Sequence, residues 1–334
     1  MNQPMMDGYA RIVRKMCDIL ELADEASRLN GFGIEVIGRC NASCEFCSIG
    51  LINRKFREGE DTQDNLTHTN LFTEEKVTRS SSKMSFELID KIFQLHNPSS
   101  IIFTGLSEPF LAPDRVFYIV DKLKESNKKH GIAAYTNGSV IQEEHMIKIL
   151  ENRSWNSLHI SLNAVSNETR IDVMGLPIDV SENNLIRFME LRKEMGREDS
   201  FHVGCVMMLT NKNRKEENEF RNKWKKYFAG KKNCSPPGMF FTTNWNGSVS
   251  TPWLRTSNQG YCSQFDSTSP TISSEGEIYL CCYSTKYTFG NILDLKATKA
   301  WKERKNIFNI KPNTAPPSNL CGSCTGGSKN QVWA

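Results

Sequence analysis

The chain has 334 residues, of which 38% are hydrophobic and 24% are charged. This ordinary composition excludes collagen-like, largely disordered and membrane-spanning proteins, since no apolar run approaches the ~20 residues that cross a bilayer. A net charge of +4 is too small over this length to indicate a nucleic-acid partner. The chain also holds 11 cysteines, and their odd number, with a polar N-terminus, favours a cytoplasmic protein that uses cysteine to bind metal.

Residues 1–30 predict an N-terminal packing helix, because apolar side chains recur there at helical spacing. From 31 to 244, short apolar runs alternate with amphipathic helical patterns at intervals of roughly 25–45 residues, which is typical of parallel βαβ units. Six such units predict an α/β fold, either an open sheet or a partial barrel, with its ligand site at the carboxyl ends of the strands. The predicted strands are Ile34–Ile37, Ile101–Thr104, Ile132–Thr136, Leu158–Leu162, His202–Leu209 and Met239–Thr243.

Two segments depart from this alternation. Residues 52–83 are polar and rich in charge, Thr and Ser, so we expect an insertion that is mobile or acts as a lid. Residues 245–334 are rich in Gly, Pro, Ser and Thr, with short strand candidates and one helix near Lys296–Lys305. We predict a separate small domain that is poor in core residues and needs a metal site to hold it together.

The first group of cysteines comes directly after the first predicted strand. Cys40, Cys44 and Cys47 have the spacing CxxxCxxC, which places three thiolates in one tight loop. Three clustered cysteines are suited to three irons of a 4Fe–4S cluster, whose fourth iron then stays open for a substrate or cofactor. The alternative is a zinc knuckle completed by a distant His or Cys.

With the aromatic Phe46 before the third cysteine, this loop resembles the signature of the radical S-adenosylmethionine (SAM) superfamily. Further motifs come after the next three strands, in the family's order. Residues 104–109 are similar to its GGEP turn, with Ser107 replacing a glycine, residues 136–138 to its TNG, and residues 161–164 to its SLN stretch. The resemblance implies a partial (β/α)6 barrel and SAM-binding roles for Phe46, Gly105, Ser107, Glu108, Pro109, Asn137, Ser161, Asn163 and Arg170.

The family's chemistry is implied with it. A reduced cluster donates one electron to SAM, and the resulting 5′-deoxyadenosyl radical removes a hydrogen atom from an unactivated carbon. The resemblance implies a flavodoxin- or ferredoxin-type electron donor, and a small molecule or a peptide as substrate. A non-catalytic electron carrier is disfavoured, because a carrier needs no SAM-binding turn.

A second group of cysteines lies near the C-terminus, and on spacing alone it suits either zinc or a cluster. The stretch resembles the SPASM/twitch extension, because Gly276-x4-Cys281 matches its hallmark, and Gly290-Asn291-Ile292 with Trp301 matches the next segment of that extension. The resemblance implies an auxiliary 4Fe–4S cluster. The spacing is close to that of 2-deoxy-scyllo-inosamine dehydrogenase and related aminocyclitol enzymes. The expected ligands are Cys262, Cys281, Cys321 and Cys324, with Cys282 left over.

Four protein ligands leave no open iron, so the auxiliary cluster is expected to accept an electron. We therefore predict dehydrogenation of a sugar or aminocyclitol alcohol by a radical SAM oxidoreductase. The alternatives are an epimerase, with Cys205 or Cys234 as a possible hydrogen donor, and a peptide-modifying enzyme. Sequence patterns do not identify the base that oxidation requires; Glu35, His202 and lysines of the 52–83 segment are candidates.

Overall fold

The fold is described from a computed structural model, for residues 27–58, 67–125, 131–241, 254–256, 269–282, 284–308, 310 and 331–333. The N-terminal helix predicted over 1–30 and the domain boundary predicted at 244/245 fall mostly or wholly outside these residues. Within them, the structure contains no helix that is both long and apolar enough to traverse a bilayer.

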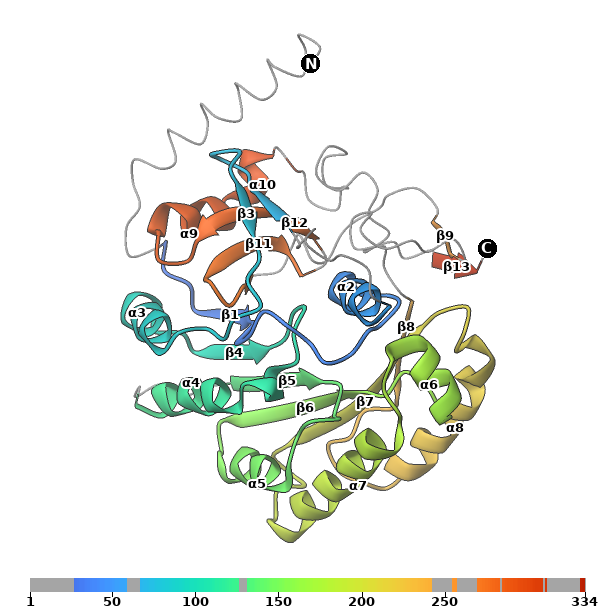
Figure 1. Cartoon of the computed structure of the whole chain (residues 1–334). Helices are drawn as coiled ribbons and strands as arrows, with labels where there is room; N and C mark the ends of the chain where they lie inside the picture. The colour runs from blue at the N-terminus through green and yellow to red at the C-terminus, as the bar shows by residue number, and fades with distance from the viewer. Residues whose placement is uncertain are drawn as a thin grey trace.

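Six parallel strands, one per predicted unit, pair with their neighbours in chain order. This confirms the predicted partial (β/α)6 barrel (Figure 1). Along the longer strands, alternate residues are buried against the helices, and the residues between them face the inside of the barrel. The strands are β1 (Gly31–Ile34), β4 (Ser100–Phe103), β5 (Gly131–Thr136), β6 (Trp155–Ser161), β7 (His202–Leu209) and β8 (Gly238–Phe241).

Helices follow the strands and cover the outer face of the barrel, as Figure 1 shows for α3, α4, α5 and α7. Ser85 begins α3 as predicted, because its Oγ accepts a hydrogen bond from Leu88 N at 3.0 Å. Phe220 and Trp224 of α8 are buried, so the lysines of that helix occupy its solvated face. The helices are α2 (Ser48–Arg57), α3 (Phe86–His96), α4 (Pro113–Glu125), α5 (Glu143–Glu151), α6 (Asn167–Met174), α7 (Asp179–Glu194) and α8 (Glu217–Phe228), with 3-10 turns η2 (Pro109–Leu111) and η3 (Arg214–Glu216).

The C-terminal region continues the sheet of the barrel. Its first strand in that sheet pairs in parallel with β1, through Gly33 and Thr271. Ile278, Phe289 and Trp301 belong to the same apolar core as the barrel, so the described part of this region is not poor in core residues, contrary to expectation. Its elements are β10 (Thr271–Ile272), β11 (Glu277–Cys281), β12 (Ser284–Asn291), α9 (Leu295–Lys302) and α10 (Arg304–Ile307); β9 (Leu254–Thr256) and β13 (Gln331–Trp333) form a separate pair.

Residues 52–57 of the polar insertion belong to α2, and residues 67–78 form a hairpin that joins the sheet. Its strands β2 (Thr67–Asn70) and β3 (Lys76–Thr78) pair with each other, and β2 pairs in parallel with β12. The inward residue of β2 is His68, which is 1% exposed and lies 5.1 Å from the Tyr279 ring of β11. A histidine in place of an aliphatic residue concealed the strand pattern. The hairpin completes an eleven-stranded sheet shared by the barrel and the C-terminal region.

Candidate functional site

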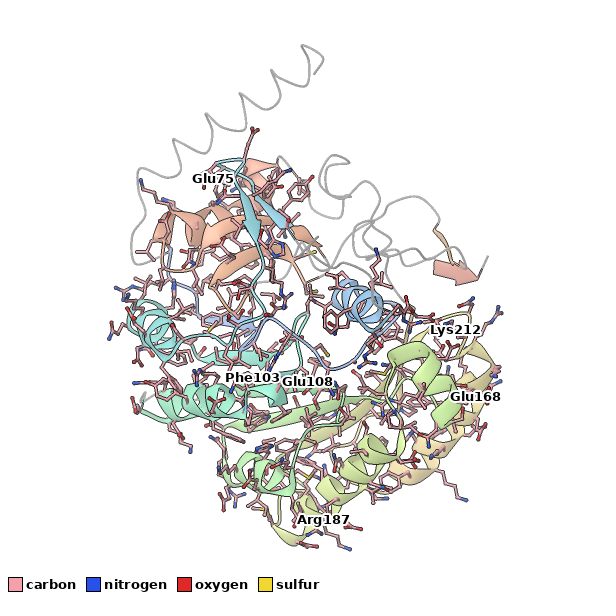
Figure 2. All side chains as sticks on the ribbon, in the orientation of Figure 1. Glu75, Phe103, Glu108, Glu168, Arg187 and Lys212 are labelled. Atoms are coloured by element: carbon pink, nitrogen blue, oxygen red, sulfur yellow. The ribbon has the colours of Figure 1, made fainter. Side chains whose placement is uncertain are left out.

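A cavity opens at the carboxyl ends of the barrel strands, between the cysteine loop and the strand-end motifs. Four loops that are far apart in the sequence supply its walls, because parallel strands bring their carboxyl ends to one edge. Figure 2 shows Glu108 inside the molecule near this edge, whereas Arg187 lies on the outer surface. The predicted site residues that line the cavity are Cys40, Cys44, Phe46, Cys47, Gly105, Ser107, Glu108, Asn137, Ser161 and Asn163.

The cysteine loop is held by the helix that comes after it. Cys47 is the N-cap residue of α2, and arginines from that helix donate to backbone carbonyls of the loop, as in Arg57 Nη2 to Asn41 O at 2.8 Å. Burial raises the pKa of Cys40 to about 12, and it also raises the pKa of Cys44. In the absence of metal both side chains are therefore neutral thiols, and iron must displace their protons when it binds.

The three cysteines fit a cluster better than a single ion. Throughout the residues that the structure covers, no three Cys, His, Asp or Glu side chains converge closely enough to hold one metal ion. A zinc ion would need its sulfur ligands at about 2.3 Å from one centre. In a 4Fe–4S cluster each cysteine binds a different iron, so the thiolates stay apart around one cavity, as Cys40, Cys44 and Cys47 do.

The turn after β4 places a carboxyl group in the cavity wall. Glu108 accepts hydrogen bonds from Thr136 Oγ1 and Asn137 N, both at 2.7 Å, and so joins this turn to the end of β5. Burial raises the Glu108 pKa to about 7, although these hydrogen bonds oppose the shift. The buried Ser107 Oγ finds no hydrogen-bond partner within the described chain. The turn therefore offers a carboxylate and a hydroxyl to a ligand.

Two asparagines also line the cavity. Asn137 donates through Nδ2 to Asn41 Oδ1 at 2.8 Å and lies 3.9 Å from Cys40 Sγ, so the end of β5 contacts the cysteine loop. Asn163 has a φ of 61° and accepts a hydrogen bond from Met208 N at 2.7 Å. Asparagine tolerates this left-handed conformation better than most residues.

Two predicted SAM-binding residues act behind the wall. Arg170 is fully buried and donates to the carbonyls of Asn137, at 2.8 Å, and Ser161, at 3.4 Å. Burial lowers the Arg170 pKa to about 10, so the side chain remains charged at neutral pH. Pro109 begins η2 and is buried. Neither residue lines the cavity, and Arg170 instead ties two strand ends together.

The remaining predicted residues lie elsewhere. Cys205 is 1% exposed in the apolar core, on the helix-facing side of β7, and does not line the cavity. Cys281 ends β11 and is half-buried, with Cys282 beside it. The other three predicted ligands of the auxiliary cluster, Cys262, Cys321 and Cys324, fall outside the described residues.

Several cavity residues, chiefly Tyr135, Met174 and Met208, were not predicted from the sequence. The period of two along β5 contained a usable signal for Tyr135, because Ala134 and Thr136 are buried on the other face. Met208 occupies the equivalent face of β7. Glu35, considered only as a possible base, is fully buried in an ion pair with Arg79.

Comparison with known proteins agrees with this geometry. The family model of the radical SAM superfamily matches residues 34–222, and that of an iron–sulfur cluster-binding domain, SPASM, matches residues 262–325. A search of curated protein sequences finds no match.

The search of solved structures finds similar chains, and those with TM-scores above 0.5 share the fold. Native anSMEcpe with bound AdoMet has a TM-score of 0.53 at 17% identity, over 83% of this chain and 82% of that one. Streptococcus suis SuiB bound to the precursor peptide SuiA has a TM-score of 0.52 at 13% identity, and the match covers 90% of this chain and 70% of SuiB. BtrN in complex with AdoMet and 2-DOIA has a lower TM-score of 0.41 at 12% identity, and the match covers 91% of this chain and 97% of BtrN.

The barrel, the cysteine loop and the cavity fit a protein that binds an iron–sulfur cluster and SAM. The family model covers more than half of the chain, which belongs to the radical SAM superfamily and carries a SPASM domain. Its cofactors are therefore SAM and 4Fe–4S clusters.

Proposed function

We propose that the protein is a radical SAM dehydrogenase that oxidises an alcohol carbon of a sugar- or aminocyclitol-type substrate. Cys40, Cys44 and Cys47 would hold the SAM-binding cluster, and Cys262, Cys281, Cys321 and Cys324 the auxiliary one. When bound, the first cluster and SAM supply the radical that removes the carbon-bound hydrogen atom, and the auxiliary cluster accepts the second electron. The hydroxyl proton goes to a base of the protein, which leaves a carbonyl.

The side chains inside the barrel would orient SAM. Glu108, Ser107 and the turn around Gly105 offer acceptors for the ammonium of SAM, as Glu108 carries a carboxylate above pH 7. Phe46, Asn137, Ser161 and Asn163 complete the lining. Arg170 and Pro109 would support this surface from behind. Both residues are buried, and Arg170 donates a hydrogen bond to the backbone carbonyl of Asn137.

The observation that carries the proposal is a row of three rings on the inner face of β5, β6 and β7. Tyr135 lines the cavity, and its ring stacks on that of His159 with centroids 4.9 Å apart and an interplanar angle of 16°. The His159 ring lies 5.2 Å from that of His202, whose Nε2 is 2.7 Å from Ser235 Oγ. Burial, and then Cys282 beside a predicted ligand of the auxiliary cluster, raise the pKa of the Tyr135 phenol.

This row supplies the base that oxidation requires. Burial, and then the neighbouring His202, lower the His159 pKa to about 4, so its imidazole is neutral at pH 7 but only a weak base. Its assignment rests on its place on the inner face of β6, stacked on Tyr135 of the cavity wall. Burial also lowers the His202 pKa. Glu35 is a weaker candidate, since its carboxylate is already committed to Arg79 and Tyr279. We therefore assign the base to His159.

Peptide modification is the second candidate, because anSMEcpe also binds a Cp18Cys peptide and SuiB binds its precursor peptide. Epimerisation through Cys205 is less favoured, since that thiol lies in the core. We further propose a cytoplasmic enzyme reduced by a flavodoxin- or ferredoxin-type protein, because low-potential clusters need such a donor.

The experiment supplies sugars, cyclitols, aminocyclitols and peptides separately, with SAM and dithionite in deuterated buffer. Product mass is then measured. We expect an alcohol to lose about two mass units, one for each hydrogen removed, as 5′-deoxyadenosine forms. His159→Asn should abolish the product, whereas His145→Asn, on the outer helix α5, should not. Solvent deuterium retained at carbon, or turnover of peptides alone, would refute alcohol oxidation.

A further inference from the structure

The SAM-binding turn is backed by a buried carboxylate at the end of β1. Glu35 is 0% exposed, and its Oε1 accepts a hydrogen bond from Leu106 N at 2.5 Å. Leu106 and its neighbour Gly105 both line the cavity. Gly105 has a φ of 106°, and a Cβ at this position would collide with Glu35. The conformation of the turn is therefore fixed against the Glu35 side chain.

The other oxygen of this carboxylate is bound by two segments outside the barrel. Arg79 comes just after the β2–β3 hairpin, and its Nη2 lies 2.9 Å from Glu35 Oε2. Tyr279 Oη, on β11 of the C-terminal region, donates to the same oxygen at 3.1 Å. The side chains of Arg79 and Glu35 are 2% and 0% exposed. Glu35 thus joins the barrel, the insertion and the C-terminal region at one point.

Net stability does not account for this arrangement. Desolvation of a buried ion pair offsets most of its Coulomb attraction, and well-packed apolar residues often stabilise a fold equally well. A buried, hydrogen-bonded charge does, however, fix the geometry of the groups that it touches. Here it touches a turn that lines the cavity, through Leu106 N, rather than a distant part of the core.

We propose that Glu35, Arg79 and Tyr279 couple the C-terminal region to SAM binding. Arg79 and Tyr279 are positioning residues: they hold the Glu35 carboxylate, and Glu35 holds the turn of residues 105–109 in the form that accepts SAM. Docking of β11 then completes the SAM site, although no residue of β11 lines the cavity. The proposal applies to any reaction that this site performs and does not depend on alcohol oxidation.

Arg79 also has polar atoms that the Glu35 carboxylate does not satisfy. The buried Nε and Nη1 of Arg79 have no hydrogen-bond acceptor among the residues described. Buried donors without partners are costly, so these atoms would suit a bound group that supplies acceptors.

The test compares SAM binding by the holoprotein, with both clusters reconstituted, between wild type, Tyr279→Phe and Glu35→Gln. Tyr118→Phe is the matched control, because it removes a tyrosine–carboxylate hydrogen bond of 2.8 Å, to Asp90, on the outer helices. Anaerobic calorimetry should give affinities about fivefold weaker for Tyr279→Phe and about tenfold weaker for Glu35→Gln. The double variant should be no weaker than Glu35→Gln, since both changes break one chain of contacts.

Electron paramagnetic resonance separates positioning from general damage. The reduced, SAM-free spectrum of Tyr279→Phe should match wild type, while the change caused by SAM should require higher SAM concentrations. Wild-type SAM affinity in Tyr279→Phe at full iron content would overturn the proposal, as would equal losses in Tyr118→Phe. If Glu35→Gln does not fold, Tyr279→Phe still decides, because it removes only one hydroxyl. Neither result depends on which substrate is oxidised.

Discussion

The two halves of the eleven-stranded sheet support the site in different ways. In the barrel half, five of the six parallel strands, β1 and β4 to β7, deliver cavity residues at or after their carboxyl ends, each from a short stretch of chain. In the C-terminal half, β10, β11 and β12 run with the β2–β3 hairpin and reach the site through one buried carboxylate, Glu35. The first half forms the lining of the site, and the second half fixes its conformation from behind.

The largest expected effect compares the two halves by the iron–sulfur cluster that each would lose. Cys44→Ala should lower iron from about eight to about four per chain and abolish 5′-deoxyadenosine formation, because the SAM-binding cluster is lost. Cys281→Ala should also leave about four irons but still cleave SAM on reduction with dithionite. Iron and sulfide assays with product chromatography check both. Full iron content in Cys281→Ala would remove that residue from the ligand set.

The next effect concerns the junction between the halves. Arg79→Met leaves Glu35 buried without its cation, so the free energy of unfolding should fall by about 3–5 kcal/mol. The control is Lys83→Met, which removes a half-exposed ion pair with Asp114. It should lower the free energy of unfolding by less than about 1 kcal/mol. Denaturant unfolding under anaerobic conditions measures both. Adding Glu35→Gln to Arg79→Met should restore part of the loss, and a simply additive double variant would contradict the coupling.

A smaller effect is a dependence of the barrel half on pH. The Glu108 pKa is raised to about 7 by burial, so the side chain is neutral below that pH and a carboxylate above it. The ammonium of SAM prefers the carboxylate, and SAM affinity should therefore fall as pH drops from 8 to 6, by up to about tenfold per unit. Glu108→Gln should bind weakly at pH 8 with little pH dependence. An unchanged pH profile in that variant would exclude Glu108 as the titrating group.

The smallest effect is a change of stability in the barrel half away from the site. Ser85→Ala removes the cap of α3 and should lower the free energy of unfolding by about 1 kcal/mol. SAM affinity should not change, since Ser85 does not line the cavity. Thermal unfolding and calorimetry together measure this. A loss of SAM affinity here would mean that any destabilisation weakens SAM binding, which would blur the distinction between the halves.

The same contrast explains how much of the molecule could be predicted from its sequence. The six strands follow a clear pattern and were predicted from local residues, whereas the cysteine loop and the strand-end turns are short contiguous motifs that could be matched to those of the family. The Tyr279–Glu35 contact joins residues 244 positions apart, and no local pattern encodes it. The β2 strand was missed because its buried residue is His68, and Tyr135 because interior positions of a barrel carry polar and aromatic side chains alike.

The place of β10 in the sheet also has a consequence for folding during synthesis. Among the barrel strands β1 is made first, yet one of its two edges is covered only when Gly33 pairs with Thr271. Until then the nascent barrel exposes an unpaired strand edge, which is a template for misassociation with other chains. A chain stopped before residue 271 should therefore aggregate, even though all six barrel strands have been synthesised.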